Sequence, residues 1–280
     1  MGNVEKSPEE KSMELYPSKD GMHPATIIFA PEAEATYGIH ARQWQGIPGI
    51  ERAANGRLWA TWYSGIDGEG PGNYVVLATC PPEGGNWFEP VLVIDPGRGR
   101  RAFDPCLWHD PQGRLCLFWA QSGDDTYYDG RAGVWMLRAE ACTSNGETPL
   151  WTGLTRIFHG VMMNKPMVLS TGEWLLPVAV WDGAGGRAKD DVKHYIGSGV
   201  VASTDGGATW EWRGAAKDVP CKSADEHMLI ERRDGSLWML IRTNYGIAQS
   251  ESRDGGRTWS RRLCLSSSRR KRLLISRGLI

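Results

Sequence analysis

The chain of 280 residues lacks the features that mark nucleic-acid-binding and membrane-spanning proteins. Its formal net charge of -1 gives no electrostatic reason to expect a nucleic-acid or membrane partner. No stretch approaches the roughly 18 apolar residues of a transmembrane helix. The first 19 residues are polar and contain no apolar signal core, so a cytoplasmic protein is expected.

Cysteine and phenylalanine are also scarce. The six cysteines, at positions 80, 106, 116, 142, 221 and 264, form no C-x-x-C pair and no grouping with histidine. A metal site is therefore not indicated, no cofactor is expected, and Cys106 and Cys116 are expected to be buried strand thiols. Against only 5 phenylalanines stand 35 glycines and 14 tryptophans. Short strands, glycine-rich turns and recurring aromatic residues are typical of an all-β repeat protein.

One octet occurs twice, almost unchanged. Ser203-Thr204-Asp205-Gly206-Gly207-Ala208-Thr209-Trp210 returns as Ser252-Arg253-Asp254-Gly255-Gly256-Arg257-Thr258-Trp259. An Asp-Gly-Gly turn needs positive φ angles that glycine adopts easily, so the pattern predicts a tight hairpin. The serine, threonine and aspartate side chains can bond backbone groups within that turn.

A longer repeat surrounds this octet. A glycine followed by an apolar strand occurs at Gly56, Gly113, Gly172 and Gly235, with spacings of 57, 59 and 63 residues. Each unit later reaches a turn tryptophan, at Trp87, Trp151, Trp210 or Trp259. A period of this length fits a four-stranded blade better than a solenoid repeat.

The octet resembles the Asp-box of sialidase-like β-propellers. The resemblance implies an all-β propeller of four-stranded blades, six in that family, with about four blades and the start of a fifth here. We expect residues 1–22 to be a polar extension and residues 23–265 to be the propeller. Residues 266–280 carry five basic and no acidic residues, which favours a truncated or frameshifted end over a basic tail that binds RNA or a surface.

In a propeller the innermost strands line a central funnel, so residues at their starts are candidates for a site. These positions supply Arg42, Gln45, Asp104, Asn164, Lys165, Asp225, Glu226 and His227. Such a mixture suits a polar, anionic sugar. The alternative is that several of them only form turns, Asp104 before Pro105 above all.

The resemblance extends to individual positions. Sialidases have an inner-strand glutamate and, sixteen residues later, an arginine that binds the substrate carboxylate; Glu226 and Arg242 have this spacing. The glutamate would polarise a tyrosine nucleophile. The acid/base residue of the family lies in a loop that corresponds to residues 64–73, where Asp67 is the direct candidate and Glu69 the substitute. A solvated glycine-rich turn is the alternative for this loop.

Two departures from the family pattern bear on function. Gly46 stands where the first-blade motif has its carboxylate-binding arginine, and Arg42 is the nearby substitute. The third arginine and the nucleophilic tyrosine belong to later blades, and Tyr245 is at the wrong place in the repeat for that role. We expect a sialidase-like glycosidase acting on a terminal acidic sugar. The alternatives are a glycosidase or lyase on another acidic sugar, or a non-catalytic carbohydrate-binding propeller.

Overall fold

The computed structural model describes residues 23–31, 36–97, 99–123, 129–141, 143–146, 148–182, 186–217, 226–244, 246–260 and 263–264. The predictions for residues 1–22, Asp225, Tyr245 and the basic tail lie outside the described residues. Within them the chain is almost entirely β, apart from two short 3₁₀ helices, η1 (Ile39–Ala41) and η2 (Lys193–Tyr195).

The described strands form four antiparallel sheets, the blades of the predicted β-propeller. The first sheet holds β1 (Thr26–Phe29), β2 (Trp44–Arg52), β3 (Leu58–Gly65), β4 (Tyr74–Cys80) and β5 (Phe88–Asp95). The second holds β6 (Arg100–His109), β7 (Leu115–Gly123), β8 (Gly133–Ala139) and β9 (Trp151–His159). The third holds β10 (Met167–Val168), β11 (Trp174–Val180), β12 (Gly197–Ser203) and β13 (Glu211–Ala216). The fourth holds β14 (Met228–Glu231), β15 (Leu237–Thr243), β16 (Gly246–Ser252) and β17 (Leu263–Cys264).

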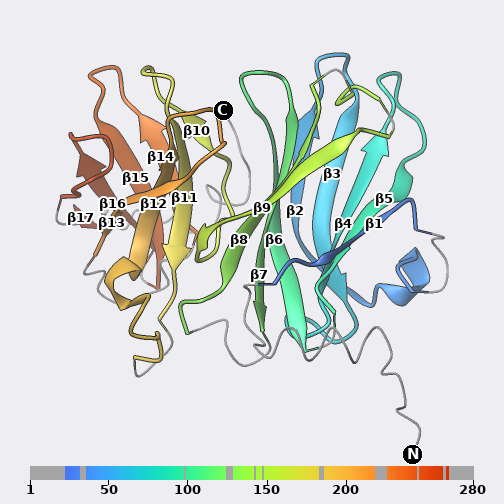
Figure 1. The fold of residues 1–280 in the computed structure, drawn as a ribbon, viewed down its shortest axis with the longest axis horizontal. Helices are drawn as coiled ribbons and strands as arrows, with labels where there is room; N and C mark the ends of the chain where they lie inside the picture. The colour runs from blue at the N-terminus through green and yellow to red at the C-terminus, as the bar shows by residue number, and fades with distance from the viewer. Residues whose placement is uncertain are drawn as a thin grey trace, which may run out of the picture.

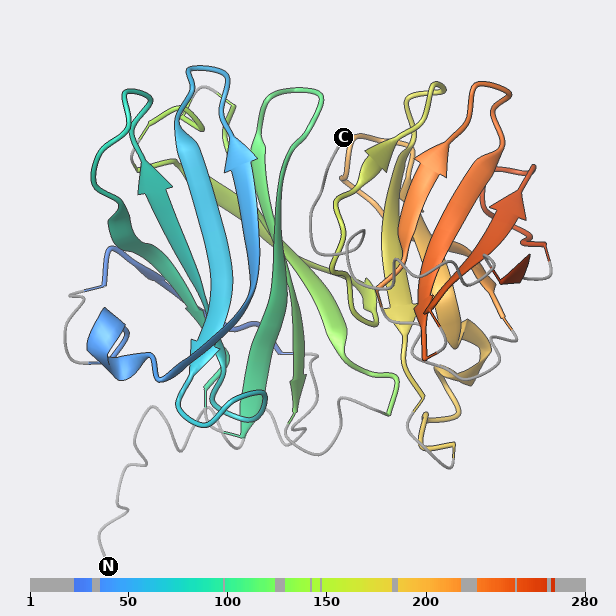
Figure 2. The same ribbon diagram turned by 180° about the vertical axis from the view of Figure 1, so that it is seen from behind.

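The sheets stand one after another in chain order, from the blue sheet on the right of Figure 1 to the orange-red sheet on the left. Figure 2 shows the same order from behind, and β1 lies outside β5 at the edge of the first sheet. Since β17 pairs with β16, it is the fourth strand of the fourth blade. The predicted start of a fifth blade would lie beyond residue 264, outside the described part.

The sequence repeat coincides with the blade. Each repeated glycine lies two residues before the second strand of its blade, which is β3, β7, β11 or β15; β1 is an additional edge strand of the first sheet. All four glycines have positive φ: +96° at Gly56, +76° at Gly113, +89° at Gly172 and +77° at Gly235. The Asp-boxes join the third strand to the fourth, β12 to β13 and β16 to β17. The turn at residues 82–87, which ends at Trp87, joins β4 to β5 in the same way.

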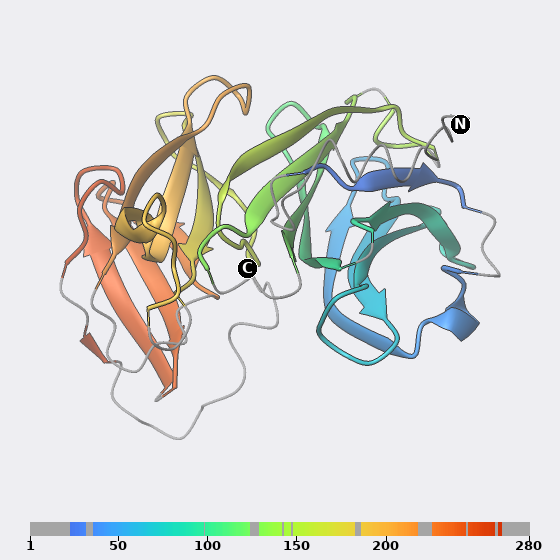
Figure 3. The ribbon, with the colours of Figure 1, turned by 60° about the horizontal axis from the view of Figure 1, so that its bottom comes forward.

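The apolar core lies between neighbouring sheets, which Figure 3 shows with the bottom of the molecule turned toward the viewer. One cluster joins the first and second sheets, a second joins the second and third, and a third joins the third and fourth. Alternate residues of one strand enter different clusters, because successive strand side chains point to opposite faces. Tyr63 belongs to the cluster facing the second sheet, whereas Trp62 belongs to a small cluster on the other face of β3.

Each Asp-box is held by its own side chains. Asp205 accepts hydrogen bonds from Thr209 Oγ1 at 2.6 Å and from Ser203 Oγ at 2.8 Å, and Ser203 Oγ accepts one from the Gly207 amide at 2.9 Å. The second copy repeats these bonds around Asp254. Hydrogen bonds to the charged carboxylate, those of the threonine first, lower the pKa of both aspartates to about 2.

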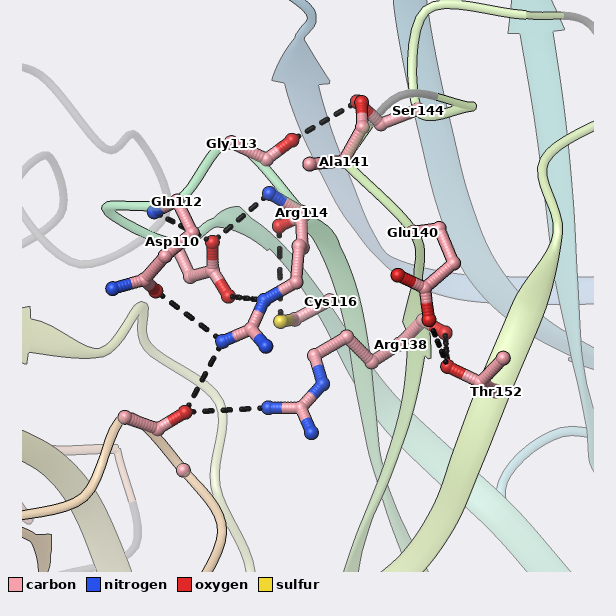
Figure 4. Close-up of polar contacts among 12 residues, drawn as sticks. Asp110, Gln112, Gly113, Arg114, Cys116, Arg138, Glu140, Ala141, Ser144 and Thr152 are labelled. Atoms are coloured by element: carbon pink, nitrogen blue, oxygen red, sulfur yellow. Dashed lines mark hydrogen bonds and ion pairs between the residues drawn. The ribbon is translucent and has the colours of Figure 1, made fainter.

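The first full Asp-box is also tied to the preceding blade. Arg114 Nη2 and Arg138 Nη1 donate to the same carbonyl oxygen, that of Gly206, at 3.1 and 3.3 Å, as Figure 4 shows. Arg114 is held in turn by the fully buried carboxylate of Asp110, at 2.6 Å from its Nε. The Asp-box therefore links the second and third blades as well as closing a hairpin.

Cys106 and Cys116 are buried free thiols, as predicted. Burial, first among the causes, raises the pKa of each to about 12. Among the described residues no helix is long and apolar enough to cross a membrane, and no cluster of three or more His, Cys, Asp or Glu could hold a metal ion.

Candidate active site

In every blade, an equivalent backbone hydrogen bond closes the hairpin between the first and second strands. The amides that donate it belong to Ala53, Asp110, Leu169 and Arg232. Six residues before these donors stand Ile47, Asp104, Met163 and Glu226. Asp104 and Glu226 are thus counterparts on the second and fourth blades, near the edge where first strands begin and second strands end. We call this edge the mouth edge; the loop after β3 lies along it, at the bottom of Figure 2.

Glu226 and Arg242 form an ion pair at the mouth edge. β14 and β15 pair with Met228 opposite Leu240, so the same register places Glu226 opposite Arg242. The predicted spacing of sixteen residues is therefore the spacing of two strands joined by a hairpin. The Arg242 side chain is 47% exposed and that of Glu226 20%, so the pair remains accessible from solvent. The sequence predicted the spacing of these two residues and the structure shows that they touch; their chemical role stays a prediction.

The second carboxylate group lies on the first blade. The Tyr63 hydroxyl donates to Glu69 Oε1 at 2.8 Å. Tyr63 is 1% exposed at the end of β3, while Glu69 is exposed in the following loop. Asp67, the other acid/base candidate, is exposed and makes no hydrogen bond within the described residues. The phenol thus contacts Glu69, the substitute candidate, and not Asp67, the direct candidate from the sequence.

Asn73 holds the loop that carries Glu69. Its buried amide donates to the Gly68 carbonyl at 2.8 Å and accepts from the Gly70 amide at 2.7 Å. The loop also bonds the second blade, through the Gly72 amide to the Arg100 carbonyl and the Asn73 carbonyl to the Ala102 amide. These contacts fix the loop more firmly than a solvated glycine-rich turn would require; that the loop carries the acid/base residue stays a prediction.

Arg101 and Asp104 of β6 complete the surroundings of Tyr63. Both are buried, and the Arg101 guanidinium lies 4.0 Å from the centre of the Phe103 ring and 5.7 Å from that of Tyr63. Asp104 has a φ of +49° at a β-bulge, a conformation that aspartate tolerates better than most residues. Burial first, then the charges of Asp104 and Glu69, raise the pKa of Tyr63 far above its usual range, so the phenol stays protonated.

Trp44 occupies the space of a side chain at position 46. A Cβ atom on Gly46 would lie 2.5 Å from Trp44 Cη2, and the indole also packs 4.9 Å from the Tyr63 ring. The substitute predicted for the missing arginine is elsewhere: Arg42 donates to the Tyr37 carbonyl at 2.8 Å and stacks on Trp62, on the opposite face of β3.

The other predicted binding residues take up separate positions. Gln45 is exposed on β2. Lys165 binds Glu51 at 2.5 Å, near the far end of β2 from the mouth edge. His227 is 1% exposed, and its Nε2 contacts the Gly199 carbonyl at 2.7 Å. Asn164 donates to the His227 carbonyl at 2.9 Å, so these two residues join the third and fourth blades.

Sequence reasoning misses Tyr63, Trp44 and Asn73. The first two belong to aromatic strands that packing alone explains, and Asn73 ends a glycine-rich loop. The available signal for Tyr63 is its place near the end of β3, six residues ahead of Glu69.

Four blades, Asp-box hairpins and acidic residues at the starts of inner strands define a sialidase-like β-propeller. The chain belongs to the family of BNR repeat-like domains, whose model matches residues 56–270.

Solved structures with the same fold include sialidases and intramolecular trans-sialidases. The leech intramolecular trans-sialidase, complexed with 2,7-anhydro-Neu5Ac, is similar with a TM-score of 0.60 and 15% identity, over 93% of this chain and 55% of that one. A Hadza microbial sialidase has a TM-score of 0.59 and 16% identity, over 80% of this chain and 47% of its own. The intramolecular trans-sialidase from Ruminococcus gnavus, in complex with oseltamivir carboxylate, has a TM-score of 0.58 and 15% identity, over 88% and 74%.

At these identities the likeness concerns the fold alone. The chain spans about half the length of the leech and Hadza proteins. No curated protein matches the sequence.

Proposed function

We propose that this chain is a sialidase-like glycoside hydrolase that acts on a terminal acidic sugar. The observation that carries the proposal is the Glu226–Arg242 ion pair at the mouth edge. A guanidinium binds a carboxylate through two parallel hydrogen bonds, and a neighbouring carboxylate fixes its orientation. The exposure of the Arg242 side chain is better explained by a role in binding the carboxylate of an incoming sugar than by a purely structural ion pair.

In this proposal the two carboxylate groups have different roles. Arg242 binds the acidic group of the sugar, and Glu226 orients Arg242 and polarises the attacking group. Glu69 or Asp67 transfers a proton to or from the glycosidic oxygen, because a carboxyl group at a mouth-edge loop can serve as general acid. The sialidase-like fold of the relatives supports this assignment by analogy.

A second candidate is a glycosidase or lyase acting on another acidic sugar, such as a uronic acid. The observation in its favour is Trp44, which fills the space of a side chain at Gly46. The arginine that the family has at position 46 would not fit there without moving the indole, so carboxylate recognition has one guanidinium fewer. A non-catalytic carbohydrate-binding propeller is the third candidate, because Asp-boxes are structural.

The test is a screen of the full chain against fluorogenic glycosides of sialic acid, uronic acids and neutral sugars. We expect cleavage of an acidic glycoside, lost in Glu226→Gln and in Arg242→Ala by about 100-fold or more. Arg253→Ala is the matched control: Arg253 is an exposed arginine of the same sheet, paired with Asp234 at 3.6 Å in the hairpin region away from the mouth edge.

Cleavage that survives both site variants would refute the assignment. Cleavage of uronic acid glycosides alone would favour the second candidate over the first. If no glycoside is cleaved but calorimetry detects binding of an acidic sugar that Arg242→Ala abolishes, the chain is a binding propeller.

A further inference from the structure

Glu69, unlike its neighbour Asp67, is held by a buried side chain. Tyr63 donates to Oε1 of Glu69 at 2.8 Å, and no other hydrogen bond reaches this carboxylate among the described residues. A carboxylate has two oxygens, so fixing one leaves the second for a substrate. The exposure of Glu69 makes that second oxygen accessible.

Tyr63 is itself immobilised on several sides. Its ring packs 4.9 Å from the Trp44 ring and 6.5 Å from the Phe103 ring. Arg101 from the second blade lies over the ring, and Asp104 from the same strand adds negative charge nearby. The hydroxyl therefore keeps one position and remains a donor, because burial and these charges keep the pKa of Tyr63 high.

The backbone of the loop is fixed as well. Asn73 and the two backbone bonds to β6 hold the segment between Gly68 and Asn73 against the second blade. Glu69 is thus fixed at both its backbone and its Oε1 atom. Asp67 precedes this segment and has neither constraint.

We infer that Tyr63 is a positioning residue that selects Glu69, and not Asp67, as the proton-transferring carboxylate of the site. This inference rests on the proposed function. Orienting a catalytic group is worth a large rate factor, and a displacement of about 1 Å can cost 100-fold. Tyr63 is too deeply buried to touch the substrate, so it acts through Glu69 alone.

Kinetics of single variants test the inference on the glycoside that the wild-type protein cleaves. We expect Glu69→Gln to lower kcat by about 100-fold or more, and by more than Asp67→Asn does. Tyr63→Phe keeps the packed ring and loses only the hydroxyl; it should lower kcat about 10- to 100-fold with little change in KM.

Tyr37→Phe is the matched control. Tyr37 also donates to a carboxylate, Asp95 Oδ2 at 2.6 Å, but in the cluster on the opposite face of the first sheet. We expect its kcat to match that of the wild-type protein. An unchanged kcat in Tyr63→Phe, or a larger loss in Asp67→Asn than in Glu69→Gln, would overturn the inference.

A measurement without substrate separates this inference from the proposed function. Carbon-13 NMR of the glutamate carboxyl groups identifies Glu69 by the signal missing in Glu69→Gln. That signal should shift in Tyr63→Phe and stay in place in Tyr37→Phe. If no glycoside is cleaved, the proposed function fails; a shifted signal then still supports the Tyr63–Glu69 coupling, and an unshifted one refutes it.

Discussion

Replacing Gly207 with alanine should destabilise the protein through two separate effects. Gly207 has a φ of +82°, where an alanine costs about 1–2 kcal/mol of strain. The new methyl group would also lie 2.7 Å from Trp174 Cζ3. Trp174 is 2% exposed and packs edge-on against Trp108 at 5.0 Å, so it has little room to move. Overpacking of this kind costs about 1–3 kcal/mol.

The free energy of unfolding should therefore fall by about 2–5 kcal/mol in Gly207→Ala. Two variants, Gly206→Ala and Gly256→Ala, isolate the strain. Gly206 has a φ of +69°, and a Cβ atom added there would meet nothing within 4 Å. Gly256 is the counterpart of Gly207 in the second Asp-box, and the nearest atom to a Cβ added there would be Leu237 Cδ1 at 3.6 Å. Each should lose only the strain of about 1–2 kcal/mol.

Urea denaturation followed by tryptophan fluorescence measures all three variants on one scale. The midpoint for Gly207→Ala should lie clearly below those of the two controls, with similar m-values. Equal losses of unfolding free energy in Gly207→Ala and Gly206→Ala would show that Trp174 moves aside without an energetic penalty, and the packing argument would be wrong.

Three further predictions concern buried ionisable groups. Asp110→Ala should lower the free energy of unfolding by about 3–5 kcal/mol, measured by urea denaturation, because it removes the buried partner of Arg114; a loss below about 1 kcal/mol would contradict this. Burial raises the pKa of Glu51, but interactions with His109, 3.7 Å away, and with Lys165, at 2.5 Å, outweigh it and lower the pKa from 4.5 to about 2. Its stabilisation is therefore complete above about pH 4.5 and lost as the pH falls toward 2, so the unfolding free energy of Glu51→Gln should depend less on pH in that window than that of the wild type. Cys106 and Cys116 should resist alkylation at pH 8 until the protein is denatured, as peptide mass spectrometry can check; rapid native labelling would argue against their burial.

The fold followed from the sequence because its signals are local. The glycine that opens each second strand and the Asp-box that joins the third strand to the fourth both depend on turn chemistry within a few residues. Counting the repeated glycines yields the four blades that the described residues form. The contact between Glu226 and Arg242 was predictable for the same reason, since a hairpin register relates the two positions.

The rest of the candidate site depends on contacts that the repeat does not encode. Lys165 and His227 occupy positions that suggest a binding role, yet they reach Glu51 on the first blade and Gly199 on the third. Arg42 lies close in sequence to the missing arginine but packs on the opposite face of the sheet. Each of these contacts depends on the face of the strand to which the side chain points and on the residues of the neighbouring blade at that face.

The sequence by itself determined the all-β repeat architecture, the length of a blade and the pairing of Glu226 with Arg242, because turns and hairpin registers are local. Only the tertiary structure decided that Trp44 takes the space beside Gly46 and that Tyr63 holds Glu69 instead of Asp67. Those outcomes arise where an inner strand, a loop and the next blade meet, and a one-dimensional spacing contains no information about which side chains fill the same volume.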